Sequence, residues 1–242
     1  MTTEPRLEHG HSREQIRRRL ARGPRVSYLR DLVFGGIDGA VTTFAIVAGV
    51  VGADLSSRIV LILGAANLLA DGFSMAAANY SSTRTEAEEY AQLRAMEARH
   101  IDVVPDGERE EVRQILHAKG FDGDGLDQAV GVITADRERW IDTMMADEHG
   151  LQPVAREPLR AALATFAAFV VCGTVPLLPY LFGLAASTVT STVMTGLTFF
   201  AIGSMRSRWS PLPWWRAGLE TAAIGLAAAA VAYVVGNLLA RL

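Results

Sequence analysis

Residues 161–205, "AALATFAAFVVCGTVPLLPYLFGLAASTVTSTVMTGLTFFAIGSM", contain no charged side chain. About 20 consecutive apolar residues cross a bilayer core about 30 Å thick, so this run is long enough for two membrane helices. The prolines of "PLLPY" (176–180) and the small residues after them offer a place for the chain to turn between the two. The stretch therefore predicts a membrane protein, although the whole chain is only 50% hydrophobic.

Three further stretches are almost as free of charge. Residues 32–52 and 59–80 each carry one charged side chain, Asp38 and Asp71, and residues 221–240 carry none. We therefore expect an all-α membrane protein with five transmembrane helices, at about 32–52, 59–80, 160–182, 187–205 and 217–240. The polar, arginine-rich residues before the first helix do not resemble a signal peptide, so that helix is expected to act as its own insertion signal.

The distribution of arginine predicts the orientation. Residues 1–31 contain eight arginines and four acidic residues, and the loop between the fourth and fifth helices contains three arginines, whereas the loop between the third and fourth contains no basic residue. By the positive-inside rule, the N-terminus and the connection between the second and third helices face the cytoplasm. The 22 arginines against one lysine favour a GC-rich bacterial genome, and hence a bacterial plasma membrane.

Four regions follow from these patterns. They are a basic N-terminal segment, the first two membrane helices, an acidic domain and the last three membrane helices, at residues 1–31, 32–80, 81–158 and 159–242. Within the first region, residues 9–23 are expected to form a basic helix at the lipid surface. A metal site at His9 and His11 is a weaker alternative.

The acidic domain, residues 81–158, holds 18 acidic and 9 basic residues, a net charge of −9 in a chain whose total is −3. Nucleic acid and anionic lipid attract basic surfaces, so we expect no nucleic-acid partner and instead a domain that collects cations. The sequence predicts three helices here. They are a continuation of the second membrane helix, a helix from Pro105 to Gly120, and a helix that Asp127 caps and Gly150 ends.

Potential metal ligands recur on these predicted helices at spacings that share one helical face. They are Glu97 and His100 on the first helix, Glu108 and Glu111 on the second, and Met144, Met145 and Glu148 on the third, followed by His149. Carboxylate and imidazole suit iron, manganese, zinc or cobalt, and a thioether adds tolerance for softer ions. The alternative interpretation is a charged face that only meets water.

Two carboxylates lie within predicted membrane helices. Each costs about 2.5–3.5 kcal/mol on insertion scales, so such groups usually face the protein interior and have a function. Asn67, Asp71 and Met75 follow one another at intervals of four residues, and because the first two helices are antiparallel, Asp38 and Met75 fall at similar depth. These four residues predict a polar seam that a cation crosses. The alternative is that Asp71 caps a backbone or pairs with a loop arginine.

Several segments together resemble the vacuolar iron transporter family. They are "YLRDLVFGGIDGAVTTFAIVAGVVGA", "LGAANLLADGFSMAAANY", "WIDTMMADEHGL", "TFAAFVVCGTVPLLPY" and "AGLETAAIGLAAAAVAYVVGNLL". The resemblance implies a homodimer of five-helix protomers, with an ion path between the two first helices. It implies export of ferrous iron, and often manganese, from the cytosol against protons.

The resemblance also implies roles for particular residues. Asp38 and Met75 match the residues of the family's ion path. The family's metal-binding domain uses glutamates and methionines that match Glu97, Glu108, Glu111, Met144, Met145 and Glu148.

This chain departs from the family pattern at two positions. His100 replaces a glutamate of the metal-binding domain and is pH-sensitive, because the ordinary pKa of histidine is about 6.5. Asn67 replaces a membrane glutamate that takes part in proton coupling in many members, and asparagine cannot titrate. Asp71, one turn away, is the candidate substitute; otherwise the protein couples differently or not at all.

The leading hypothesis is a divalent metal transporter, not an enzyme, that moves Fe²⁺ or Mn²⁺ out of the cytosol in exchange for protons. Its expected partners are divalent metal ions, protons, the bilayer and a second copy of the chain, and it needs no prosthetic group. One alternative is a membrane-tethered, ferritin-like di-iron protein built on Glu97 and His100, since such bundles use Glu-x-x-His pairs. Another is a metal-binding scaffold without transport.

Overall fold

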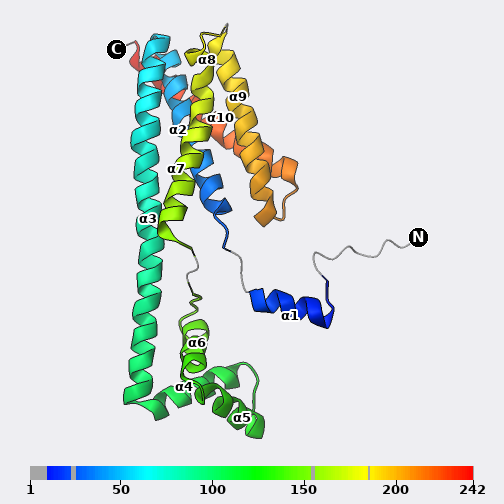
Figure 1. Cartoon of the computed structure of the whole chain (residues 1–242). Coiled ribbons are helices and arrows are strands. Elements are labelled where there is room, and N and C mark those ends of the chain that lie inside the picture. The colour runs from blue at the N-terminus through cyan, green and yellow to red at the C-terminus, as the bar shows by residue number, and fades with distance from the viewer. Residues whose placement is uncertain (1–9, 23–25, 154–155, 185, 242) are drawn as a thin grey trace, which may run out of the picture.

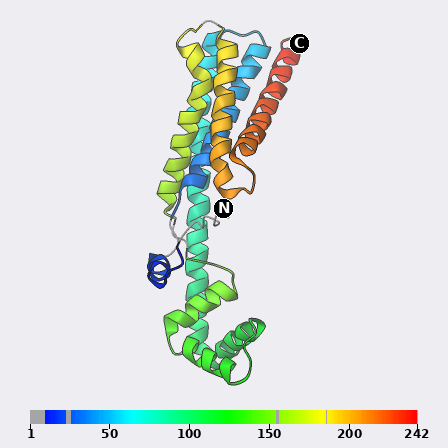
Figure 2. The same ribbon diagram turned by 90° about the vertical axis from the view of Figure 1, so that its right-hand side faces the viewer.

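The computed structural model describes residues 10–22, 26–153, 156–184 and 186–241, which contain helices and irregular segments but no strand. Five long helices form a bundle, and one of them extends far beyond it to a small helical domain (Figure 1). Figure 2, turned by 90°, shows the same separation between the bundle and the domain.

The bundle confirms the five predicted membrane helices, because five of its helices are long and apolar enough to cross a membrane. Their observed bounds are α2 Leu29–Gly52, α3 Ser57–Val103, α7 Pro158–Thr174 with its continuations η1 Val175–Leu177 and α8 Leu178–Leu181, α9 Ser187–Arg206, and α10 Trp214–Leu239. Between α9 and α10 lies the short helix η2, Ser207–Trp209.

Helix α2 is the centre of the bundle and packs against both α7 and α10. Gly39 allows the close approach to α7, because a Cβ at this position would lie 2.3 Å from the carbonyl oxygen of Phe169. Phe44, Val47 and Phe199 fill the core around that contact. Close backbone approach through small residues is the usual way in which membrane helices associate, since lipid gives them no hydrophobic driving force.

Helix α3 continues without a break from the bundle into the acidic domain, as the sequence predicted. Its 47 residues correspond to a length of about 70 Å at 1.5 Å per residue. The domain is completed at the far end of α3 by α4 Pro105–Ala118, α5 Gly123–Thr134 and α6 Arg137–Asp147 (Figure 1).

The prediction of a single helix between Asp127 and Gly150 is wrong, because the structure has two helices there, α5 and α6. Asp136 causes the break: its side chain accepts a hydrogen bond of 2.8 Å from the backbone N–H of Arg139 and so caps a new helix. The predicted cap is also wrong. Asp122 caps α5, and Asp127 lies within that helix.

The acidic domain has its own apolar core, to which Trp140, Ile141, Met144 and Met145 of α6 contribute. Ion pairs also attach α6 to α3. Arg94 pairs with Asp142 at 2.6 Å, and Arg137 of α6 pairs with Asp102 at 2.8 Å. The domain is therefore fixed at the end of the long helix by both packing and charge.

The predicted basic helix near the N-terminus is present as α1, Arg13–Arg22. His9 lies outside the described residues. In the part of the chain that the structure describes, His11 belongs to no group of three or more potential metal ligands.

Candidate ion pathway and metal sites

A cavity of about 720 Å³ opens between α2, α3 and the segment before α7, at the end of the bundle nearest the acidic domain. We call it the pathway cavity. It brings together Asp38 from α2 with Asp71 and Met75 from α3, three of the four residues predicted for an ion path. The residues that line it are Arg30, Asp31, Phe34, Asp38, Asp71, Ser74, Met75, Ala78, Asn79, Ser82, Glu86 and Arg156.

The lining of the pathway cavity is acidic. It contains four carboxylates, Asp31, Asp38, Asp71 and Glu86, against the two guanidinium groups of Arg30 and Arg156, a formal charge of −2. Charges interact more strongly near a protein of low dielectric constant than in bulk water. One divalent cation would balance this charge.

Asn67, the fourth predicted residue, does not line the cavity. Its Nδ2 donates a hydrogen bond of 3.2 Å to Oγ1 of Thr42, so it links α3 to α2. The alternative interpretation of Asp71 finds no support, because within the described residues its carboxylate makes neither a capping hydrogen bond nor an ion pair. Asp71 faces the cavity without a fixed partner.

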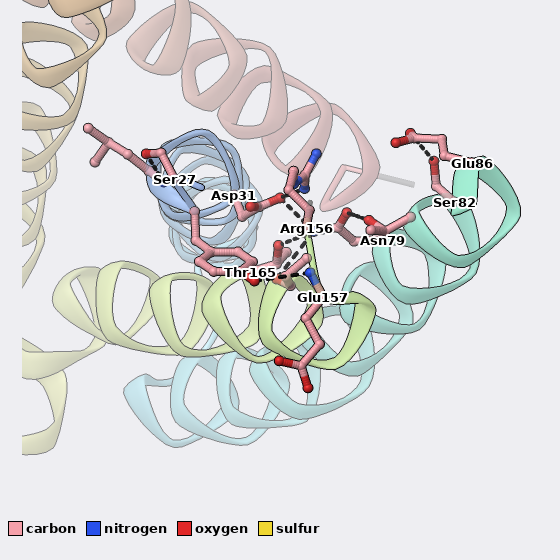
Figure 3. Close-up of polar contacts among 12 residues, drawn as sticks. Ser27, Asp31, Asn79, Ser82, Glu86, Arg156, Glu157 and Thr165 are labelled. Atoms are coloured by element: carbon pink, nitrogen blue, oxygen red, sulfur yellow. Dashed lines mark hydrogen bonds and ion pairs between the residues drawn. The ribbon is translucent and has the colours of Figure 1, made fainter. Parts of the chain in front are cut away.

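A buried polar network that the sequence did not predict borders the same cavity (Figure 3). Asp31 Oδ1 accepts from Arg156 Nη2 at 2.5 Å and from Asn79 Nδ2 at 2.9 Å. The same Asn79 nitrogen also lies 2.7 Å from Oγ1 of Thr165 on α7. One signal was available in the sequence: Asp31 precedes Asp38 by seven residues, two helical turns, and so shares its face of α2.

In the acidic domain, Glu97 is the centre of two groups of potential metal ligands. Glu97, His100 and Glu108 form one group, and Glu97, Glu148 and His149 form the other, each with ligand atoms within 4.8 Å of one another. His149 Nε2 lies 2.9 Å from Glu97 Oε1, and His100 Nδ1 lies 3.3 Å from Glu108 Oε1. The arrangement offers carboxylate and imidazole on both sides of one shared glutamate.

Two of these carboxylates are almost completely buried. Glu97 is 1% exposed and Glu108 is 3% exposed, and Oε2 of each has no hydrogen-bond partner among the described residues. A buried carboxylate oxygen without a partner is costly. A bound cation would relieve that cost.

Burial and mutual repulsion change the proton affinities in this cluster. Burial, followed by the charges of Glu111 and Glu97, raises the pKa of Glu108 to about 7. Burial and the charge of Glu97 raise the pKa of Glu148. The hydrogen bond to Glu97 raises the pKa of His149, because it favours the protonated ring.

The other predicted ligands of the domain belong to neither group. Glu111 is exposed and belongs to neither group, although its charge acts on Glu108. Met144 and Met145 are buried in the apolar core of the domain. Sequence reasoning noted His149 but did not include it in the predicted site, because its contact with Glu97 spans 52 residues.

Comparison with known proteins identifies the family. The profile of the VIT family matches residues 29–237. The chain is 34% identical over 209 residues to the vacuolar iron transporter of Centaurea cyanus, which covers 85% of each chain. It is 33% identical over 212 residues to vacuolar iron transporter 1 of Arabidopsis thaliana, which covers 86% of this chain and 85% of that one.

A relative from Toxoplasma gondii gives a similar match. The vacuolar iron transporter of Toxoplasma gondii is 34% identical over 224 residues, or 88% of this chain and 74% of the relative. The matched region includes all five long apolar helices and the acidic domain between them. This chain therefore belongs to the VIT family, and it is an integral membrane transporter rather than an enzyme.

Proposed function

We propose that this transporter moves Fe²⁺, and Mn²⁺ as a second substrate, out of the cytosol in exchange for protons. The observation that carries the proposal is the pathway cavity, where Asp38, Asp71 and Met75 meet in a lining of formal charge −2. The names of the relatives, vacuolar iron transporters, support iron as the first substrate.

The ligand chemistry of the cavity favours a transition metal. Carboxylates bind most divalent cations, whereas a thioether is a poor ligand for the hard ions Mg²⁺ and Ca²⁺. Met75 beside Asp38 and Asp71 therefore favours Fe²⁺ over these two abundant cations.

In this proposal, the acidic domain collects ions before transport. Glu97 is shared between one ion held with His100 and Glu108 and another held with Glu148 and His149. The buried, unpartnered oxygens of Glu97 and Glu108 support it, because they are acceptors that a cation would use. Glu111, Met144 and Met145 remain predicted ligands of this domain.

The proposed orientation places the acidic domain and the N-terminus in the cytoplasm, in a bacterial plasma membrane. The arginine-rich N-terminal segment supports this orientation. A homodimer is also part of the proposal. Phe34, Ser74 and Ala78, which line the cavity, are exposed to the outside of the bundle, where a second copy would cover them.

Proton exchange in this chain requires a titratable group, and Asn67 cannot serve because its amide does not ionise. We assign that role to Asp71, because it faces the pathway cavity and has no fixed partner among the described residues. A proton bound to Asp71 would reduce the negative charge around Asp38, and its release would restore that charge for the next cation.

The ferritin-like alternative has less support. Such di-iron sites need a Glu-x-x-His pair from each of two helices. The described residues offer the pair Glu97 and His100, but the second histidine, His149, directly follows Glu148 and does not lie three residues after it. This alternative also gives no role to Asp38 and Asp71.

The test is uptake of Fe²⁺ and Mn²⁺ into proteoliposomes, with and without an imposed proton gradient, for the wild type and Asp38→Ala. Uptake that requires Asp38 and increases with the gradient supports the antiporter. Uptake that requires Asp38 but does not change with the gradient supports metal transport and contradicts proton exchange. If no uptake occurs while the acidic domain still binds metal, the scaffold hypothesis replaces transport.

A further inference from the structure

The carboxylate of Asp31 is buried at the border of the pathway cavity and is already neutralised. Asp31 is 5% exposed, and its Oδ1 receives the guanidinium of Arg156 at 2.5 Å and the amide of Asn79 at 2.9 Å (Figure 3). Its second oxygen, Oδ2, has no hydrogen-bond partner among the described residues. A buried carboxylate requires a counter-charge, and here an arginine supplies it.

Arg156 belongs to the chain that returns from the acidic domain to the bundle, just before α7. The next residue is also attached to the start of α2, because the backbone N–H of Glu157 donates to the hydroxyl of Tyr28 at 3.0 Å. The returning chain is thus held at two adjacent points, next to the cavity that contains Asp38. Asp31 precedes Asp38 by two turns of α2, about 10 Å along the helix at 1.5 Å per residue.

We propose that Asp31 is an additional ligand for the transported cation and that Arg156 is its exchangeable counter-ion. This inference rests on the proposed function. In the metal-free protein Arg156 holds Asp31 in place, and an arriving divalent cation takes the carboxylate and displaces the guanidinium. Arg156 acts through Asp31 and is therefore a positioning residue.

The displacement gives the ion a direction. Once released, the guanidinium of Arg156 remains beside the cavity, because Glu157 and Tyr28 hold the adjacent backbone. Its positive charge then repels the cation at Asp31 and favours transfer to Asp38, deeper in the bundle. When the cation leaves, Asp31 and Arg156 pair again, and the site returns to its starting state.

The first test compares uptake of Mn²⁺ by the wild type and Arg156→Gln in proteoliposomes. We expect the KM of the variant to fall by about tenfold, a typical coupling between two competing ligands, because Asp31 is then free to bind the ion. The maximal rate should fall too, since no guanidinium then repels the bound ion from Asp31 toward Asp38. Arg156→Lys, which keeps the charge, should restore the KM.

The matched control is Arg160→Gln, because Arg160 is an exposed arginine four residues away that pairs with Glu157 at 2.6 Å and does not line the cavity. Its KM and maximal rate should equal those of the wild type. A KM of Arg156→Gln that is unchanged or raised, with a wild-type melting temperature, overturns the proposal. If the ion pair between Arg156 and Asp31 only stabilised the structure, Arg156→Gln would lower the transport rate without increasing the affinity for Mn²⁺.

A second measurement uses only the wild type and so does not depend on the folding of a variant. Phenylglyoxal labels accessible arginines, and mass spectrometry reads the labelling of Arg156 relative to Arg160 with Mn²⁺ or with Mg²⁺. We expect Mn²⁺ to increase the labelling of Arg156 by several fold. Labelling that is unchanged or reduced overturns the proposal. If the labelling rises but the wild type transports no metal, the proposed function fails and the exchange at Asp31 stands.

Discussion

Buried carboxylates have different ion-pair partners in the membrane bundle and in the acidic domain. In the bundle, Asp31 is paired with an arginine, whose charge is permanent. In the acidic domain, the only ion-pair partners of the described Glu97 and Glu108 are the histidines His149 and His100. Imidazole loses its proton near neutral pH and can then bind a metal, which a guanidinium cannot do.

This difference suggests two kinds of cation site. The acidic domain combines groups that can all become ligands, so it is suited to holding ions. The pathway cavity combines carboxylates with fixed positive charges, so it is suited to releasing them.

Asp38→Asn should abolish transport and leave metal binding by the acidic domain intact. We expect the rate of Mn²⁺ uptake to fall by about 100-fold or more, because even outer-shell partners of metal ligands contribute about 10–100-fold. Uptake into proteoliposomes and Mn²⁺ binding by calorimetry are measured on the same preparation. Asp124→Asn, at an exposed carboxylate of α5, is the control. If the variant loses binding and transport together, the two regions are not separate sites.

Glu97→Gln should produce the opposite pattern. Because Glu97 belongs to both ligand groups, we expect the affinity of the acidic domain for metal to fall by about 100-fold. Transport should be slowed at low metal concentration and keep its maximal rate, since the pathway cavity is unchanged. Glu110→Gln, at an exposed glutamate of α4, is the control. Loss of the maximal rate would mean that ions cannot reach the cavity without the domain.

The fold was more predictable from sequence than either site. The five apolar helices and the continuation of α3 follow from local composition, because the length of a membrane helix is set by the bilayer. The break between α5 and α6 was missed because Asp136 competes with the helix through one local hydrogen bond, and no glycine or proline marks it. Asp38, Asp71 and Met75 were predicted to meet because α2 and α3 are neighbours in sequence.

The contacts that sequence reasoning missed join residues far apart in the chain. Arg156 and Asp31 are separated by 125 residues, and their pairing depends on how the chain returns from the acidic domain to the bundle. Helical periodicity describes one helix at a time, so it could not predict that Arg156 and Asp31 form a pair. The same limit applies to His149 and Glu97, which α6 and α3 bring together.

His149→Gln should separate the two ligand groups of the acidic domain. We expect the metal affinity of the group that contains His149 to fall by about tenfold. The affinity of the group that contains His100 and Glu108 should not change. Imidazole favours iron and zinc over manganese more than carboxylate does, so the loss should be larger for Zn²⁺ than for Mn²⁺. Calorimetric titration with each metal measures both effects. His117→Gln, at an exposed histidine of α4, should change neither. An equal loss of affinity at the two ligand groups would contradict the proposal that they are separate sites.

The smallest effect concerns the stability of the metal-free acidic domain. Burial raises the pKa of Glu108 to about 7, above the ordinary glutamate value of 4.5, so the folded state binds more protons than the unfolded state between these pH values. Stability contributed by the protonated form is present below pH 4.5 and is lost as the pH rises toward 7. Ionised Glu108 therefore destabilises the metal-free protein at about pH 8.

Glu108→Gln removes this ionisation, because glutamine stays neutral at every pH. We expect the melting temperature of the metal-free variant to exceed that of the wild type by about 5 °C at about pH 8 and to equal it at about pH 4. Saturating Mn²⁺ should reverse the order at the higher pH, since binding to the folded state stabilises the wild type more. An equal shift at both pH values would mean that Glu108 acts through packing and not through its charge.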